Sequence, residues 1–206
     1  MEHKFISQKN FRYQIVGNIE KATKLIFVFH GYGQLAEFFI RKFKELPENY
    51  LVVAPEGMHR FYLNGTSGRV GASWMTKDDR ESDIQDNIHW LSQLFEEINQ
   101  KKKFEKSIIL GFSQGGATAA RWFFSGKINA NQLILWASVF PPDLEKPEIK
   151  EKSSNYFVIG DNDEYYFEHQ QIEEIEFYQK IGFQTKTFGG KHDIEINTLL
   201  SILKEI

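Results

Sequence analysis

The chain has 206 residues, of which 41% are hydrophobic, and its 25 basic and 28 acidic side chains give a formal net charge of -3. This length favours a single domain, 1–206, and the absence of cysteine excludes disulfides, thiolate metal sites and a cysteine nucleophile. The near-balanced charge gives no electrostatic footprint for nucleic acid, and apolar runs such as 25–29 and 133–137 are far shorter than the ~20 residues of a membrane helix. Residues 1–10 lack the apolar stretch of a secretory signal, so we expect a cytoplasmic protein without an integral membrane segment.

Short β-rich runs alternate with amphipathic stretches along the chain. A hairpin is predicted from 5–7 and 11–16, around a turn at 9–10. The other predicted strands are 25–29, 51–54, 107–110, 133–136, 156–159 and 184–188. The predicted helices are 35–46, 83–100 with Ser82 as its N-cap, 117–124, 172–181 ended by Gly182, and 194–206.

This alternation predicts an α/β fold. Strands that are apolar throughout are typical of a mostly parallel sheet covered by helices on both faces. In such a sheet the reactive groups gather in the loops at the carboxyl ends of the strands. The short chain leaves little room for a separate cap domain, so we expect an open site.

The longest irregular stretch, 56–82, follows the second of the apolar strands and contains four glycines. Such a segment can arch over a site as a partial lid and form one wall of an acyl pocket. Trp74 is the residue we expect to line that pocket. The alternative is a plain surface loop held by its aromatic side chains.

The loop after 107–110 contains a candidate nucleophile. Residues 111–116 read GFSQGG, which places Ser113 in a G-x-S-x-G turn between a strand and a helix. This turn exposes the serine hydroxyl above the sheet and directs the following backbone N–H groups toward a developing oxyanion. Phe112 is expected to point into the core.

A serine nucleophile needs a base, and the base needs an acid that orients it. His192 follows the last predicted strand and two glycines, and we expect it at the start of the final helix, at the same edge of the sheet as Ser113. The neighbouring Asp193 is expected to complement the dipole of that helix. The acid should follow 156–159, where Asp161 and Asp163 are both available, and spacing alone does not choose between them.

Residues 30–33, HGYG, follow the strand 25–29. A sequence of this kind commonly supplies one half of an oxyanion hole in esterases and lipases. We therefore expect the backbone N–H groups of Tyr32 and Gln114 to bind the oxyanion. The His30 side chain is interpreted as a structural anchor for this loop.

Five motifs in chain order carry a family resemblance: HGYG, APEG, GFSQGG, GDND and KHD, from about residue 30 to residue 192. Together they resemble the carboxylesterase, phospholipase and acyl-protein thioesterase branch of the α/β-hydrolase superfamily. The resemblance implies the α/β-hydrolase fold, selects Asp163 over Asp161 as the acid, and implies neither a cofactor nor a metal.

The expected function is that of a serine hydrolase that cleaves a small-molecule carboxylic ester through an acyl-enzyme. Ser113, His192 and Asp163 would form the catalytic triad. A thioesterase or lysophospholipase acting on longer acyl chains is one alternative. Another is a non-catalytic ligand-binding protein with the same fold, and an amide- or peptide-cleaving hydrolase would use the same machinery.

Overall fold

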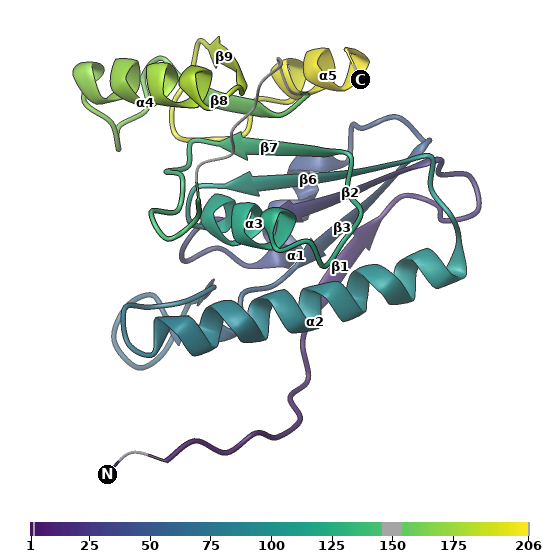
Figure 1. Cartoon of the computed structure of the whole chain (residues 1–206), viewed down its shortest axis with the longest axis vertical. Coiled ribbons are helices and arrows are strands. Elements are labelled where there is room, and N and C mark those ends of the chain that lie inside the picture. Colours follow the sequence, from purple (N-terminus) through teal and green to yellow (C-terminus); the bar gives the residue numbers. More distant parts are fainter. Residues whose placement is uncertain (2, 146–153, 206) are drawn as a thin grey trace.

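The computed structural model describes residues 1, 3–145 and 154–205. Within them, seven strands form the main sheet in the order β1-β3-β2-β6-β7-β8-β9, parallel throughout except for the antiparallel pair β1–β3 (Figure 1). The strands are β1 (Tyr13–Val16), β2 (Lys24–Phe29), β3 (Tyr50–Pro55), β6 (Lys106–Phe112), β7 (Gln132–Trp136), β8 (Tyr156–Gly160) and β9 (Gln184–Phe188). The predicted α/β fold with a mostly parallel sheet is confirmed.

Helices cover both faces of this sheet. One face packs against α2 (Arg80–Lys101), α3 (Gln114–Phe124) and α4 (Glu168–Lys180). The other face packs against α1 (Ala36–Phe39), the 3-10 helix η1 (Ile40–Phe43) and α5 (Ile196–Lys204). Alternate residues of β2 enter the two cores, Phe27 on the first face and Val28 on the second, as the pleat of a strand requires. None of the described helices combines the length and the apolar character needed to span a bilayer.

The predicted N-terminal hairpin is wrong. β1 pairs with β3 instead, and the described residues of 3–12 form no strand. Phe5 and Ile6 are almost fully exposed, because so short an apolar run has no neighbouring strand on which to bury its side chains. Phe11 packs instead on Trp90 of α2, with the rings stacked 4.5 Å apart.

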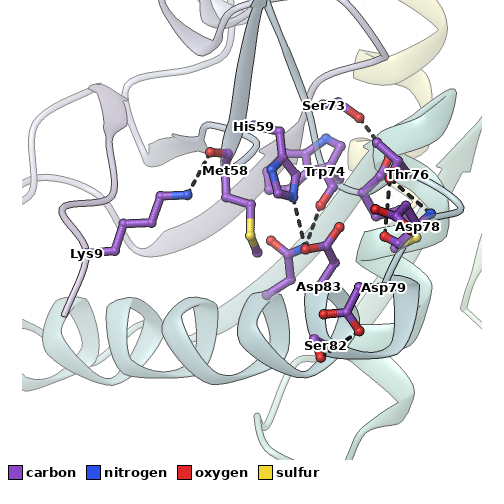
Figure 2. Close-up of polar contacts among 12 residues, drawn as sticks. Lys9, Met58, His59, Ser73, Trp74, Thr76, Asp78, Asp79, Ser82 and Asp83 are labelled. Atoms are coloured by element: carbon purple, nitrogen blue, oxygen red, sulfur yellow. Dashed lines mark hydrogen bonds and ion pairs between the residues drawn. The ribbon is translucent and has the colours of Figure 1, made fainter. Parts of the chain in front are cut away.

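The segment 56–82 is more regular than expected. β4 (His59–Tyr62) and β5 (Val70–Ser73) form an antiparallel hairpin of their own, with Tyr62 opposite Val70. The start of β4 is tied to α2, where His59 Nε2 lies 3.0 Å from Asp83 Oδ1 (Figure 2). The hairpin therefore has a fixed position beside the sheet.

All five predicted helices start at other residues than expected, and the predicted helix 35–46 is divided into α1 and η1. The starts of α2 and α5 change the expected place of a named residue. α2 begins earlier, with Asp79 in the N-cap position at φ 48°, so Ser82 lies inside the first turn and not at the cap. The backbone N–H groups of Ser82 and Asp83 both donate to the Asp79 carbonyl, which extends the helix by one turn. α5 begins after Glu195, whose carboxylate caps the helix, so His192 lies in the preceding loop. Gly182 follows the end of α4 with φ +86°, as predicted.

Candidate active site

Ser113 occupies the turn between β6 and α3, with φ 53° and ψ -125°. A non-glycine residue rarely adopts this conformation, and such strain is found mainly at functional sites. Gly115 permits the turn, because a Cβ there would overlap the backbone carbonyls of Phe29 and His30. β6 lies in the middle of the sheet between β2 and β7, so the serine stands at the centre of its carboxyl edge.

His192 and Asp163 come together although 29 residues separate them. His192 Nδ1 lies 2.7 Å from Asp163 Oδ2, and the Asp163 side chain has no exposed surface. The second carboxylate oxygen accepts the Tyr165 backbone N–H at 3.0 Å. The imidazole packs on Phe112, with ring centroids 4.8 Å apart, and on Tyr165 at 4.4 Å. Phe112 is buried, as expected, and its ring contacts the imidazole.

Asp161 is occupied elsewhere. Its Oδ1 accepts the Gly190 N–H at 2.9 Å and an amide hydrogen of Asn162 at 2.7 Å, and its side chain is exposed. It thus ties the loop after β8 to the loop after β9, while Asp163 faces the imidazole. Asp193 lies two residues before the N-cap of α5, and its Oδ1 pairs with Lys42 Nζ at 2.6 Å and accepts the Ile194 N–H at 2.8 Å.

The loop after β2 passes directly over the serine. A Cβ at Gly31 would lie 3.3 Å from Ser113 Cβ and 3.1 Å from the Phe112 ring. Within the described residues, the backbone N–H groups of Tyr32 and Gln114 have no hydrogen-bond acceptor. Neither N–H is therefore committed to another group, as an oxyanion hole requires.

His30 fixes this loop from inside the protein. Its Nε2 accepts the Gly57 N–H at 2.9 Å, so the ring proton is on Nδ1, which donates to the Gly31 carbonyl at 2.8 Å. Burial lowers the pKa of the imidazole to about 4. A neutral, fully buried histidine with both nitrogens bonded is a structural anchor, as predicted.

Trp74 does not line the cleft, contrary to the prediction. It is fully buried, and its Nε1 donates to the His30 carbonyl at 2.8 Å. Its carbonyl accepts a hydrogen bond from Asn87 of α2 at 2.9 Å. These partners turn the indole inward, against Phe29 in the core.

The side chain of Gln114 binds the end of the β4–β5 hairpin. Its Nε2 donates to Ser73 Oγ at 3.0 Å and to the Met75 carbonyl at 3.1 Å, and its Oε1 accepts the Trp74 N–H at 3.2 Å. The hairpin is thus fastened to the turn that carries Ser113. Sequence reasoning assigned a role only to the Gln114 backbone.

Ser113 and His192 open into one cleft of about 510 Å³. Its other lining residues come from α3, the loop after β7, and α4 with the turn before it: Gln114, Ala117, Ala137, Ser138, Val139, Tyr165, Tyr166, Gln170, Glu173 and Glu174. Ala137 has φ 47°, so the cleft contains two residues in the left-handed region. None of the cleft's described lining residues comes from 56–82, so the expected lid does not form a wall of this cleft.

Glu56 is a buried acid that sequence reasoning did not single out, although its motif was noted. It accepts a hydrogen bond from Arg12 Nε at 2.9 Å and one from the Ala36 N–H at 3.4 Å. It therefore positions the start of α1, directly after the His30 loop. In the described part of the chain no cluster of three or more histidine, aspartate or glutamate side chains is arranged to hold a metal ion.

A mostly parallel sheet with a serine on the strained turn between a central strand and its helix is the arrangement of the α/β-hydrolases. The family model described as phospholipase/carboxylesterase matches residues 11–196. The chain therefore belongs to the phospholipase/carboxylesterase family.

Solved structures resemble the chain in fold. Esterase PE8 is 19% identical with a TM-score of 0.72 over 96% of this chain and 100% of that one. A carboxylesterase from Mesorhizobium loti is 15% identical with a TM-score of 0.72 over 95% and 94%. Acyl-protein thioesterase 2 from Zea mays is 15% identical with a TM-score of 0.68 over 94% and 96%.

A sequence relative comes from Oryza sativa subsp. japonica. It is named a probable 1-acylglycerol-3-phosphate O-acyltransferase and is 30% identical over 116 residues. That match covers 56% of this chain but only 25% of the relative. The chain thus spans about a quarter of this longer protein.

Proposed function

We propose that the protein is a serine esterase that cleaves carboxylic esters through an acyl-enzyme on Ser113. The observation that carries the proposal is the 2.7 Å contact of a buried Asp163 with His192, in the same cleft as a serine on a strained turn. Membership of the phospholipase/carboxylesterase family supports the same class of reaction.

The reaction would proceed in two halves. Ser113 Oγ attacks the ester carbonyl while His192 Nε2 takes the hydroxyl proton, and the N–H groups of Tyr32 and Gln114 bind the oxyanion. As the tetrahedral adduct collapses, the C–O bond to the alcohol breaks and His192 returns the proton to the leaving oxygen. Water, deprotonated by the same imidazole, then releases the acid. Asp163 holds the proton on Nδ1 throughout.

The experiment compares hydrolysis of short-chain p-nitrophenyl esters by the wild type and by Ser113→Ala. We expect the substitution to abolish all but a residual rate. Equal turnover by the two proteins would contradict the assignment of Ser113.

A panel of esters and thioesters of graded acyl length then separates the carboxylesterase from the thioesterase or lysophospholipase alternative. A preference for oxygen esters of short acids supports the carboxylesterase. Faster cleavage of long-chain thioesters or lysophospholipids would favour the alternative.

A further inference from the structure

The cleft over Ser113 has one wall that the acyl-transfer steps do not use. The first half of α4 contributes Gln170, Glu173 and Glu174 to the lining. No lysine or arginine is found among the described residues that line the cleft. This wall therefore presents two carboxylates to a bound substrate.

One cation beside the cleft is already paired. Arg121 contacts the lining residue Ala117 through Nη1, but its Nε and Nη2 donate to the Asp143 carboxylate at 2.8 and 2.6 Å. Its side chain is almost fully buried. Arg121 therefore does not offset the charge of α4 at the cleft surface.

Burial and, to a smaller extent, the negative charge of this wall both raise the pKa values of neighbouring groups. The pKa of Tyr166 is raised by burial and by the charges of Glu174 and Asp163. The pKa of Glu174 is itself raised, by burial and by the charge of Glu173. An additional anion placed beside these side chains would meet repulsion, and a cation would meet attraction.

The position of the wall decides which part of a substrate it meets. His192 must reach the leaving oxygen to return a proton to it, so the alcohol portion lies on the histidine side of the serine. Tyr165 packs on His192, and Tyr165 and Tyr166 continue the lining from the histidine to α4.

We propose that Glu173 and Glu174 select esters whose alcohol portion carries a positive charge and disfavour those whose alcohol portion is anionic. This inference rests on the proposed function, because it names the substrate class of the same site. Glu173 is exposed, so its attraction to a substrate is weakened by water and salt. From the modest strength of exposed ion pairs we expect a preference of about 3- to 10-fold at low ionic strength.

The test uses three butyrate esters that differ in the charge of the alcohol: butyrylcholine, its neutral isostere 3,3-dimethylbutyl butyrate, and 2-sulfoethyl butyrate. kcat/KM is measured for each at low and high salt with the wild type, with the double variant Glu173→Gln/Glu174→Gln, with Glu173→Lys, and with Glu176→Gln. Glu176 is an exposed acid on α4 outside the cleft lining, so its variant removes one acidic charge from the same helix without changing the cleft wall.

We expect the wild type to prefer the choline ester over its neutral isostere and to cleave the sulfonate most slowly. The double variant should lose the preference, the Glu176→Gln variant should keep it, and Glu173→Lys should shift it toward the sulfonate. Each ratio is taken within one variant, so a general change in activity cancels.

Equal kcat/KM values for the choline ester and its isostere in the wild type would overturn the inference. The same loss of preference in Glu176→Gln would also overturn it. If hydrolysis of the neutral ester depends on Ser113 but the three esters show no charge preference, the proposed function remains supported and this inference alone fails. Failure to cleave the neutral ester would contradict the proposed function as well.

Discussion

The Asp163 carboxylate is buried against His192, with Oδ2 2.7 Å from Nδ1 and no exposed side-chain surface. In the proposed reaction this contact fixes the tautomer that leaves Nε2 free to accept the serine proton. Asp163→Asn should therefore lower kcat by about 10³- to 10⁴-fold. Steady-state kinetics on a p-nitrophenyl ester measures the loss.

Asp161→Asn is the matched control, since this acid lies on the same turn but binds the Gly190 N–H. We expect its effect on kcat to stay below about tenfold, as for loss of one exposed hydrogen bond. A larger loss in Asp161→Asn than in Asp163→Asn would reverse the assignment of the acid.

The hydrogen bonds of Gln114 to the hairpin give a second prediction. Gln114→Ala keeps the backbone N–H but releases Ser73 and Met75, and Ser73→Ala removes one of the same contacts. We expect each substitution to lower kcat by about tenfold with little change in KM, because the donor is misaligned only in the transition state.

The double variant Gln114→Ala/Ser73→Ala tests whether the two act as one unit. Its loss should be close to that of Gln114→Ala alone. Fully additive losses would show that the contact between Gln114 and Ser73 does not position the oxyanion donor.

The buried position of Trp74 can be tested by substitution. Trp74→Phe removes the Nε1 hydrogen bond to the buried His30 carbonyl and should lower the free energy of unfolding by about 1–3 kcal/mol. Urea denaturation measures this change. The acyl chain-length profile should not change, whereas Val139→Phe, at an exposed cleft residue, should alter it. An altered profile in Trp74→Phe with unchanged stability would contradict the buried placement.

The buried His30 predicts a pH dependence of stability. Its pKa falls from 6.5 to about 4 on burial, so between these values the unfolded chain binds a proton that the folded protein does not. The contribution of His30 to stability is therefore complete above pH 6.5 and is lost as the pH falls toward 4. From pH 7 to 4.5 this should cost about 2–3 kcal/mol.

Urea unfolding of the wild type and of His30→Gln at several pH values measures this contribution of His30 to stability. The slope of the free energy of unfolding against pH, between pH 6.5 and 4.5, should be smaller in His30→Gln, whatever the absolute stability of that variant. His89→Gln, an exposed histidine on α2, controls for the loss of a histidine elsewhere. Equal slopes for wild type and His30→Gln would contradict the proposed anchor.

Much of the fold could be predicted because its strands are apolar throughout. The run 25–29 lies within β2, and the spacing within 83–100 falls inside α2. The β4–β5 hairpin was missed because 59–62 and 70–73 are short and include charged residues and a glycine. The N-terminal hairpin was predicted wrongly because local pattern does not show that β1 pairs with β3, some 40 residues away.

The candidate site was less fully predictable. Reactive residues are expected in loops at the carboxyl edge of the sheet, so Ser113 and His192 could be predicted as site residues. The structure puts both in one cleft. Spacing could not choose between Asp161 and Asp163, because the choice depends on which carboxylate the loop after β9 meets. Trp74 was misplaced because its burial depends on His30 and Asn87, which are distant in sequence. The position of Gln170, Glu173 and Glu174 in the cleft lining could not be predicted either, because it depends on how α4 packs.

The central claim is that Ser113 is an activated nucleophile. The most direct measurement is labelling with a fluorophosphonate probe, followed by mass spectrometry of the labelled peptide. We predict a single adduct on Ser113 that is absent from Ser113→Ala and forms far more slowly in His192→Ala. An unlabelled wild-type protein, or a label on another residue that persists in Ser113→Ala, would contradict the account and favour a non-catalytic binding protein.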